Sequence, residues 1–329
     1  MSQKFHVVIT DNPFDGSSIE EEILGRVGAT VRKFHCSNET EVIQAAKRAD
    51  LVLCDSSPVT RKVILSLEKT IGIVEYGIGY DNIDVYAATE RGIVVCNVPD
   101  FMTFEVADHA VTLLLALSRK LHKILPATRA GEWNWKKFRP IDRLDGKTAG
   151  IIGFGNIGRQ VAERLRAFKV DILAYDPYIP PENIKKLGAQ PSTLQELLAN
   201  SDLVSIHVPL NKETRHLIGE KELALMKPSA ILVNTSRGAV IDQEALVASL
   251  RTGRPCAVGL DVLSQEPPKP RDPILGFENV VLTPHMGWYS KQSAQRLQEY
   301  AALEGERILT GQTPKHPVNP QVLAIKRGN

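Results

Sequence analysis

The chain lacks the features of a membrane or secreted protein. No apolar stretch approaches the roughly 20 residues that a bilayer span requires, and the run at 111–117 is far shorter. The first residues, with Asp11, Asp15 and the run Glu20–Glu22, do not resemble a signal peptide. Its four cysteines show neither CxxC pairing nor metal-ligand spacing. We therefore expect a cytoplasmic protein with reduced thiols and no metal.

An excess of charge of one sign is also missing. The chain has 40 Lys and Arg against 38 Asp and Glu, for a formal net charge of +2. Such a balance creates no field that would steer the protein toward nucleic acid or a membrane surface. The basic cluster at 135–139 is short and is typical of an exposed loop. We expect a small-molecule ligand and neither a nucleic-acid nor a membrane partner.

The most informative segment is the glycine-rich sequence Gly153–Gly158. It lies between an apolar run at 148–152 and a helix-like stretch at 159–168, and the next apolar run ends at Asp176. Strand, glycine turn, helix, strand and acid in this order are typical of a dinucleotide-binding unit. A glycine turn of some other α/β unit is the alternative, and the flanking elements favour the cofactor.

Each glycine of this turn has a distinct expected role. Gly153 permits the tight turn, Gly155 lets the backbone approach a pyrophosphate, and Gly158 lets the helix pack closely on the strand. The helix N-terminus then offers unpaired N–H groups to the phosphates. Asp176 would accept hydrogen bonds from the adenosine ribose and repel a 2′-phosphate, which favours NAD over NADP.

Strand-like and helix-like stretches alternate on both sides of this turn, which predicts parallel sheets covered by helices on both faces. Before it we expect strands at 5–10, 29–34, 51–54, 71–76 and 93–97. After it we expect further strands at 203–208, 230–234, 257–262 and 280–282. A long apolar helix is predicted at 104–124, buried in a core or in a subunit interface, and a final helix at 290–309.

Three segments each place one ionisable residue where a predicted strand ends: Asn234–Gly238, Asp261–Pro267 and Thr283–Trp288. Ligands of open α/β sheets collect outside the carboxyl ends of the strands, so we expect these segments to converge. Each ionisable residue alone also has an ordinary structural explanation, as a surface ion pair, a turn or a satisfied histidine.

Together Arg237, Glu266 and His285 suit hydride chemistry at a carbonyl beside a carboxylate. Arg237 can hold the substrate carboxylate as an always-charged donor. His285 can give a proton to the carbonyl oxygen during reduction and take it back during oxidation. Glu266 would fix the tautomer of His285 and favour its imidazolium form.

These segments closely resemble the D-isomer-specific 2-hydroxyacid dehydrogenases. The resemblance rests on Gly77–Asp84, Glu105–His109, the glycine turn, His207–Leu210, Thr235–Gly238, Asp261-Val262 with Glu266-Pro267, and Thr283–His285. It implies two doubly wound α/β domains: a central Rossmann NAD domain at 103–296 and a discontinuous, flavodoxin-like substrate domain at 1–102 and 297–329. It also implies an NAD-dependent enzyme that interconverts 2-keto acids and D-2-hydroxy acids.

The resemblance further assigns residues. Arg237, Glu266 and His285 would be catalytic. The implied cofactor contacts are Val106, Gly153, Gly155, Asn156, Ile157, Gly158, Asp176, His207, Val208, Pro209, Thr214, Thr235, Ser236, Arg237, Asp261, His285 and Gly287. The implied substrate contacts are Tyr76, Gly77, Ile78, Gly79, Arg237 and Trp288. A homodimer through the NAD domains, involving the helix at 104–124 and Trp133–Trp135, is also implied.

Two positions bear on the substrate. Trp288-Tyr289-Ser290 resembles the C-terminal-binding-protein-like branch, in which the tryptophan lines the pocket. Glu75 stands where that branch and phosphoglycerate dehydrogenases have an arginine, and a carboxylate there would disfavour 3-phosphoglycerate. The same branch includes corepressors, so an NAD(H)-sensing binding protein is the alternative function.

Overall fold

A computed structural model describes residues 5–326, and these divide into two compact units. Unit 1 comprises the chain up to Phe101 and again from Ser290 on, and unit 2 comprises Met102–Tyr289. The first boundary lies one residue from the expected one. The second lies at Ser290 and not at 297, because α12 (Lys291–Leu309) packs along its length on α1 (Ser18–Gly25) and the sheet of unit 1.

Unit 1 is a five-stranded parallel sheet in the order β2-β1-β3-β4-β5, the flavodoxin-like order that the resemblance implied. Its strands are β1 (Phe5–Ile9), β2 (Ala29–Lys33), β3 (Leu51–Cys54), β4 (Gly72–Glu75) and β5 (Val94–Cys96). Its other helices are α2 (Glu39–Ala46), α3 (Arg61–Ser66), α4 (Val85–Glu90) and α13 (Gln321–Lys326).

Helices cover both faces of this sheet. Apolar side chains of α2, α3 and α4 form one core with the sheet. On the other face α12 crosses β3 and β4 so closely that a Cβ on Gly72 would stand 2.7 Å from Ile308 Cγ2. The central strands β3 and β4 are buried at every residue, which explains their continuous apolar sequences.

Unit 2 is a seven-stranded parallel sheet in the order β12-β11-β10-β9-β6-β7-β8. Its strands are β6 (Thr148–Ile152), β7 (Asp171–Tyr175), β8 (Gln190–Pro191), β9 (Leu203–Ile206), β10 (Ile231–Asn234), β11 (Ala257–Leu260) and β12 (Val280–Leu282). Because β6 lies between β7 and β9, the strand order reverses there, and the crevice for a dinucleotide opens at such a point. This is the predicted Rossmann arrangement.

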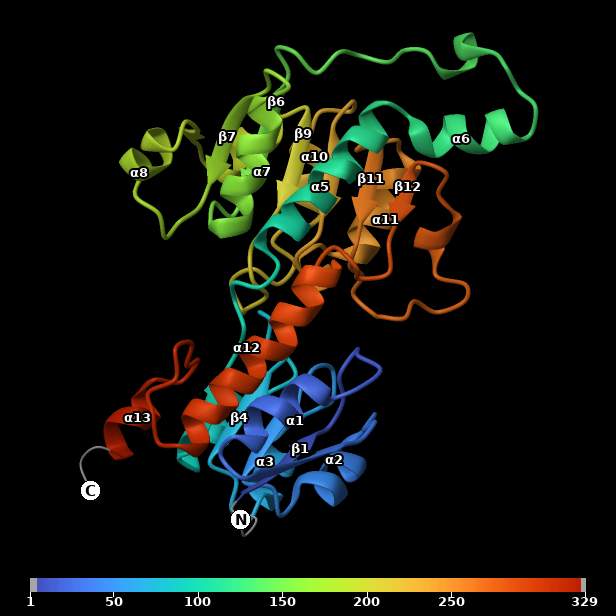
Figure 1. Cartoon of the computed structure of the whole chain (residues 1–329). Helices are drawn as coiled ribbons and strands as arrows, with labels where there is room; N and C mark the ends of the chain where they lie inside the picture. The colour runs from blue at the N-terminus through green and yellow to red at the C-terminus, as the bar shows by residue number, and fades with distance from the viewer. Residues whose placement is uncertain (1–4, 327–329) are drawn as a thin grey trace. The chain divides into compact units, whose positions relative to one another are not determined.

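The helices of unit 2 form two layers around the sheet (Figure 1). One layer contains α5 (Thr103–Ser118), α7 (Asn156–Arg166) and α8 (Pro181–Lys186), and the other contains α9 (Leu194–Asn200), α10 (Glu220–Leu225) and α11 (Gln243–Arg251). The short α8 and β8 were not predicted, because neither shows a clear apolar period.

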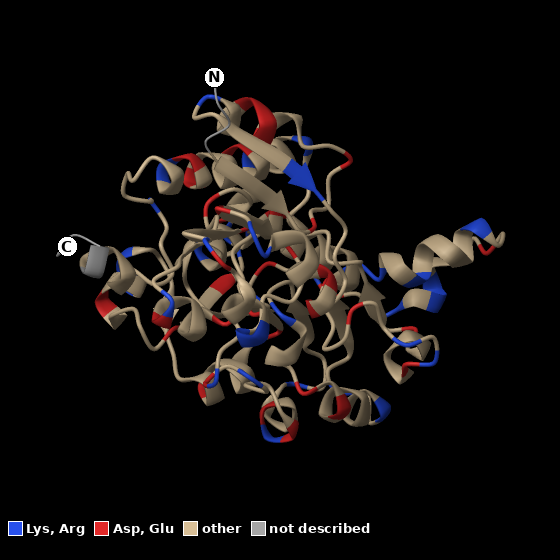
Figure 2. Ribbon diagram, turned by 90° about the horizontal axis from the view of Figure 1, so that it is seen from below, with Lys and Arg blue, Asp and Glu red and all other residues tan. Residues whose placement is uncertain are grey.

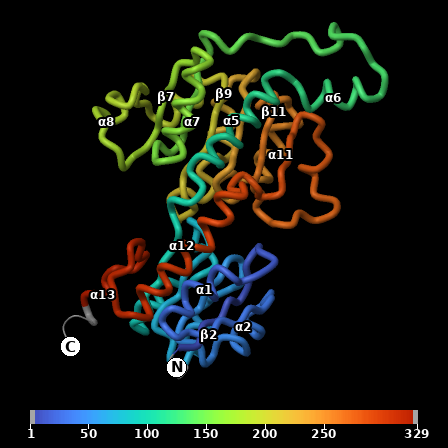
Figure 3. Tube along the Cα trace, viewed as in Figure 1, coloured from blue at the N-terminus to red at the C-terminus, as the bar shows by residue number. Residues whose placement is uncertain are grey.

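The single long helix expected at 104–124 is wrong. α5 ends at Ser118, and Lys120 adopts a left-handed backbone with φ of 54° before α6 (Leu121–Arg129) begins. α6 and the following 3₁₀ turn at Trp135–Phe138 contain no buried residue. Together with the chain leading back to β6 they form an arm that extends from the sheet (Figures 1 and 3). The segment 119–147 is called the arm below.

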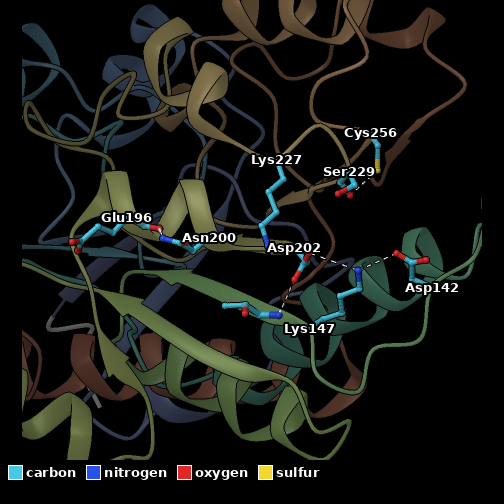
Figure 4. A network of polar contacts seen from close by, with 9 residues as sticks. Asp142, Lys147, Glu196, Asn200, Asp202, Lys227, Ser229 and Cys256 are labelled. Carbon is cyan, nitrogen blue, oxygen red and sulfur yellow. Dashed lines mark hydrogen bonds and ion pairs between the residues drawn. The ribbon is translucent and has the colours of Figure 1, made fainter.

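Charged residues connect the amino ends of neighbouring strands in unit 2. Asp202 accepts a hydrogen bond from the Thr148 N–H at 3.0 Å and pairs with Lys227 at 3.1 Å. Lys147 forms ion pairs with both Asp202 and Asp142 (Figure 4).

Elsewhere in the protein, basic and acidic residues are interspersed along the chain (Figure 2). Over residues 5–326 no helix is long and apolar enough to cross a membrane.

Candidate active site

The glycine turn has the geometry that its sequence predicts. Gly153 has φ of +88°, and a Cβ there would lie 2.6 Å from the His207 carbonyl oxygen. A Cβ on Gly158 would lie 2.1 Å from the Gly153 carbonyl oxygen, so α7 could not approach β6 with any side chain at that position. At Gly155 a Cβ would meet nothing within 4 Å. The first and third glycines are therefore required by packing, whereas the second leaves open space in front of the N-terminus of α7.

Asp176 is tied to this turn by its own carboxylate. Oδ2 accepts the Phe154 N–H at 2.9 Å, and Oδ1 accepts the Tyr178 N–H at 3.0 Å. Each carboxylate oxygen has a second lone pair for a ribose hydroxyl. The acid thus fixes the turn in addition to the ribose role that the sequence suggested.

The loop after β9 forms the other wall of the crevice. The Nε2 atom of His207 forms a hydrogen bond with Ser205 Oγ at 2.8 Å. Burial lowers the pKa of His207 to about 3, so the ring is neutral. Val208 is buried, Pro209 is exposed, and the Thr214 hydroxyl donates to the Pro209 carbonyl at 2.5 Å. The backbone of this loop is consequently closed on itself beside Gly153.

The loop after β10 is shaped by buried Asn234. Its side chain accepts the Ser236 N–H at 3.0 Å and donates to the Arg237 carbonyl at 2.9 Å. A Cβ on Gly238 would lie 1.9 Å from the Leu263 carbonyl carbon, so glycine is required where this loop meets the one after β11. This contact brings the loop of Arg237 to the loop of Glu266, as the strand-end argument predicted.

Glu266 and His285 form the expected pair. His285 Nδ1 lies 2.7 Å from Glu266 Oε2, and the other carboxylate oxygen accepts the Leu263 N–H at 2.8 Å. Burial raises the pKa of Glu266, but the His285 hydrogen bond and charge, with a contribution from Arg237, outweigh it and hold the pKa below its usual value. With Nδ1 bound to Glu266, the Nε2 atom of His285 remains for a substrate oxygen.

Buried Asp261 holds the turn that carries His285. Its carboxylate accepts the Met286 N–H at 3.0 Å, the Gly287 N–H at 2.8 Å and the Thr283 hydroxyl at 2.5 Å. His109 of α5 lies 3.3 Å from the same carboxylate. His285 itself adopts a left-handed φ of 51°, and its N–H donates to the Asp261 carbonyl. Asp261 therefore positions the histidine, a role additional to the cofactor contact expected of it.

The other predicted cofactor residues lie within unit 2 in the segments expected. Val106 is buried on α5, and Asn156 and Ile157 begin α7. Trp288, which was predicted to contact the substrate, is half-buried with its ring 5.5 Å from that of Tyr289. The buried Thr235 hydroxyl has no hydrogen-bond partner in residues 5–326. An unsatisfied buried hydroxyl is costly, so an adjacent ligand group fits this position. These observations match the polar groups and open turn that NAD requires.

The predicted substrate residues Tyr76, Gly77, Ile78 and Gly79 lie in unit 1 after β4 and stay predictions. Glu75 does not support the argument against a phosphorylated substrate, because its side chain is directed into the interior of unit 1. Its side chain is 2% exposed and accepts hydrogen bonds from Asn82 at 3.2 Å and Cys54 at 3.3 Å. Burial and the charge of Asp55 raise the pKa of Glu75 well above its usual range. Burial and the raised pKa both weaken any repulsion of a phosphate by Glu75.

Sequence reasoning missed Asn234, Thr283 and His109 as positioning residues. Thr283 and His109 occur inside segments that carried the resemblance, and Asn234 begins one of the three strand-end segments, but nothing in the sequence indicated their roles. Hydrogen bonds between α5 and the loops after β11 and β12 join residues far apart in sequence, and no local pattern reports them.

Comparison with known proteins gives the same family. Residues 111–287, more than half of the chain, match the model for the "D-isomer specific 2-hydroxyacid dehydrogenase, NAD binding domain". The chain belongs to the D-isomer-specific 2-hydroxyacid dehydrogenase family. The matched region is the NAD-binding domain of a dehydrogenase family, so the predictions of the family, the enzyme class and the NAD cofactor are confirmed.

Named relatives in the family differ in substrate. A D-3-phosphoglycerate dehydrogenase of Methanocaldococcus jannaschii is 40% identical over 98% of this chain, which spans only 61% of that relative's length. A glyoxylate reductase of Korarchaeum cryptofilum is 41% identical over 87% of each chain.

Solved structures of the 2-hydroxyacid dehydrogenase family share the fold. A glyoxylate reductase from Paecilomyes thermophila superposes with a TM-score of 0.87 at 32% identity, over 98% of this chain and all of that one. A D-lactate dehydrogenase from Aquifex aeolicus, complexed with NAD and lactic acid, has a TM-score of 0.84 at 27% identity, covering 93% and 96%. The proposed C-terminal-binding-protein-like branch stays a prediction.

Proposed function

We propose that this protein reduces a small 2-keto acid to the D-2-hydroxy acid with NADH, using His285 as the general acid. The observation that carries the proposal is the 2.7 Å Glu266–His285 pair beside the loop of Arg237, at the carboxyl edge of a sheet with an NAD-type glycine turn. Two relatives named for glyoxylate and lactate support a small substrate.

The residues divide the work of the reaction. When bound, NADH supplies a hydride to the carbonyl carbon and becomes NAD. Arg237 holds the substrate carboxylate and polarises the carbonyl through a fixed positive charge. His285 transfers the Nε2 proton to the carbonyl oxygen, and Glu266 stabilises the imidazolium before the transfer. The reverse sequence oxidises the hydroxy acid.

A turnover assay tests this proposal. We expect the purified protein to oxidise NADH with glyoxylate, pyruvate or hydroxypyruvate, and chiral analysis of the pyruvate or hydroxypyruvate product should give only the D-isomer. Phosphohydroxypyruvate belongs in the panel, because the buried Glu75 does not exclude it. NADH binding without turnover on any of these acids would instead favour the alternative, an NAD(H)-sensing binding protein.

We also propose that the arm forms a homodimer contact. Trp133 is 91% exposed and Trp135 is 70% exposed, and the arm surrounds a cavity of about 770 Å³. Large exposed apolar side chains around a hollow are typical of a protein interface. Sedimentation should show a dimer at micromolar concentration, and Trp133→Ser with Trp135→Ser should shift it toward monomer. A wild-type monomer would contradict this assignment.

The cytoplasmic location stays a prediction.

A further inference from the structure

Two loops that flank the glycine turn are joined by one side-chain hydrogen bond. Tyr178 follows β7 by three residues, and Glu213 lies in the loop after β9. The Tyr178 hydroxyl donates to Glu213 Oε2 at 2.5 Å. Since β7 and β9 lie on opposite sides of β6, the bond connects the two sides of the crevice where the strand order reverses.

Both residues of this bridge are anchored. The Tyr178 N–H donates to Asp176 Oδ1 at 3.0 Å, which places the tyrosine next to the acid expected to bind the ribose. The Glu213 N–H donates to Asn211 Oδ1 at 2.8 Å, in the loop that Thr214 closes. The Glu213 hydrogen bond and charge raise the pKa of Tyr178, so its hydroxyl remains a donor.

Core packing does not explain this arrangement. Tyr178 is 73% exposed, so its ring contributes little to the interior of unit 2. An exposed tyrosine held at its backbone and at its hydroxyl presents a fixed wall beside Asp176. Through the tyrosine, Glu213 adds a second carboxylate on the side of the crevice opposite Asp176, and Glu213, like its neighbour Lys212, is exposed to ions and ligands.

We propose that Tyr178 and Glu213 form a clasp over the adenosine half of the NAD site, and that Glu213 is a second residue, besides Asp176, that discriminates against NADPH. This inference rests on the proposed NAD-dependent function. The phosphate that distinguishes NADPH carries a charge of about −1.5 to −2 at neutral pH. A carboxylate held nearby repels it, while NADH, which lacks that group, is not affected.

The binding of reduced cofactor to the protein without substrate tests the clasp. Dissociation constants for NADH and NADPH follow from the fluorescence of the reduced nicotinamide, independently of turnover. In Glu213→Gln the amide oxygen still accepts from Tyr178, but the charge is gone. We expect NADPH to bind about twofold to fivefold more tightly, with NADH nearly unchanged. The gain should shrink at high salt, because ions screen exposed charges.

Tyr178→Phe separates the bridge from the charge. It removes the hydrogen bond and leaves both carboxylates, so we expect weaker NADH binding, by about threefold, with the preference for NADH retained. Asp176→Ala provides the positive control and should reduce the preference more than Glu213→Gln does. Glu182→Gln on α8 matches the change in net charge at an exposed position outside the bridge.

The outcomes separate this inference from the proposed function. An unchanged NADH-to-NADPH ratio in Glu213→Gln, or an equal change in Glu182→Gln, would overturn the role of Glu213. An unchanged NADH affinity in Tyr178→Phe would overturn the clasp. Either result leaves keto-acid turnover by the wild-type protein intact. If the wild type binds NADH but reduces no keto acid, the proposed reaction fails while the binding comparison still decides the clasp.

Discussion

The two units share one architecture but differ in what the polar residues at the carboxyl edge of the sheet contact. Both are parallel sheets whose strand ends carry polar residues at the carboxyl edge. In unit 1 these groups bind one another: the Asp11 carboxylate accepts the N–H groups of Asp55, Ser56 and Ser57, and Glu75 is buried against Cys54 and Asn82.

At the same edge of unit 2, the ionisable side chains are partly exposed to solvent. The Glu266 and His285 side chains are 34% and 43% exposed, and Gly155 faces open space. The polar groups that are buried, Asn234 and Asp261, satisfy backbone groups of the loops that carry Arg237 and His285. The comparison teaches that in unit 2 the buried polar groups hold the loops, so that exposed atoms such as His285 Nε2 can face a ligand, whereas in unit 1 the polar groups mainly satisfy one another.

The largest effect should come from removing a reactive group of unit 2. We expect His285→Ala to lower kcat by about 10²- to 10⁴-fold, because it removes the general acid. Arg237→Ala should reduce turnover at every pH, since the guanidinium does not titrate in this range. Because His285 is also an expected cofactor contact, NADH affinity measured by fluorescence should fall in His285→Ala, but by far less than kcat. Near-native turnover of His285→Ala would remove the proton-transfer role.

The next effect should come from the group that positions His285. Asp261→Asn replaces one of the oxygens that hold Thr283, Met286 and Gly287 by an N–H donor. We expect kcat to fall by up to about 100-fold, because small misplacements of a catalytic group are this costly. His109→Gln, which changes a single contact of the same carboxylate, should have a smaller effect. Steady-state kinetics checks this order, and an Asp261→Asn enzyme with native kcat would contradict it.

A smaller effect is expected at Glu266, which accepts the hydrogen bond from His285 Nδ1. Glu266→Gln keeps an oxygen that can accept this bond but removes the carboxylate charge, and a hydrogen bond to a neutral group is weaker than one to a charged group. We therefore expect kcat to fall by about tenfold, with coenzyme affinity nearly unchanged. Steady-state kinetics checks this, and native kcat in Glu266→Gln would refute the pairing.

Glu266 should also make folding stability depend on pH, because its pKa is lowered in the folded protein. Because its folded-state pKa is depressed, the pair stabilises the protein above the ordinary carboxyl pKa, and this stabilisation is lost as pH falls through the lowered value. Urea unfolding between pH 3 and 7 should therefore show a smaller acid-induced decrease in Glu266→Gln than in the wild type.

The smallest effect on activity should come from the buried acid of unit 1. The folded-state pKa of Glu75 is raised, so its stabilising contribution is complete below the ordinary carboxyl pKa and is lost as pH rises through the raised value. Glu75→Gln should flatten this decline in unfolding free energy while kcat changes by less than about twofold. Glu22→Gln, at a side chain that is 76% exposed, is the matched control. An equally steep decline in both variants would contradict the raised pKa of Glu75.

Local sequence was sufficient for much of this protein. The apolar runs predicted the strands β3, β6 and β9, and the spacing of Gly153, Gly155 and Gly158 predicted the turn, because both depend on residues close together in the chain. The positions of Arg237, Glu266 and His285 at strand ends predicted that their loops meet, since parallel strands end at one edge. The catalytic roles of these three residues stay a prediction.

Tertiary structure decided what depends on contacts between distant segments. It buried Glu75 and raised its pKa, broke the helix after Ser118 at a left-handed Lys120, and made Asp261 the support of the His285 turn. It also joined Tyr178 to Glu213 across two loops. The sequence determines which residues end the strands, but the protonation state and the hydrogen-bond partner of each depend on neighbours that only folding brings close, because burial and charge act through space and not along the chain.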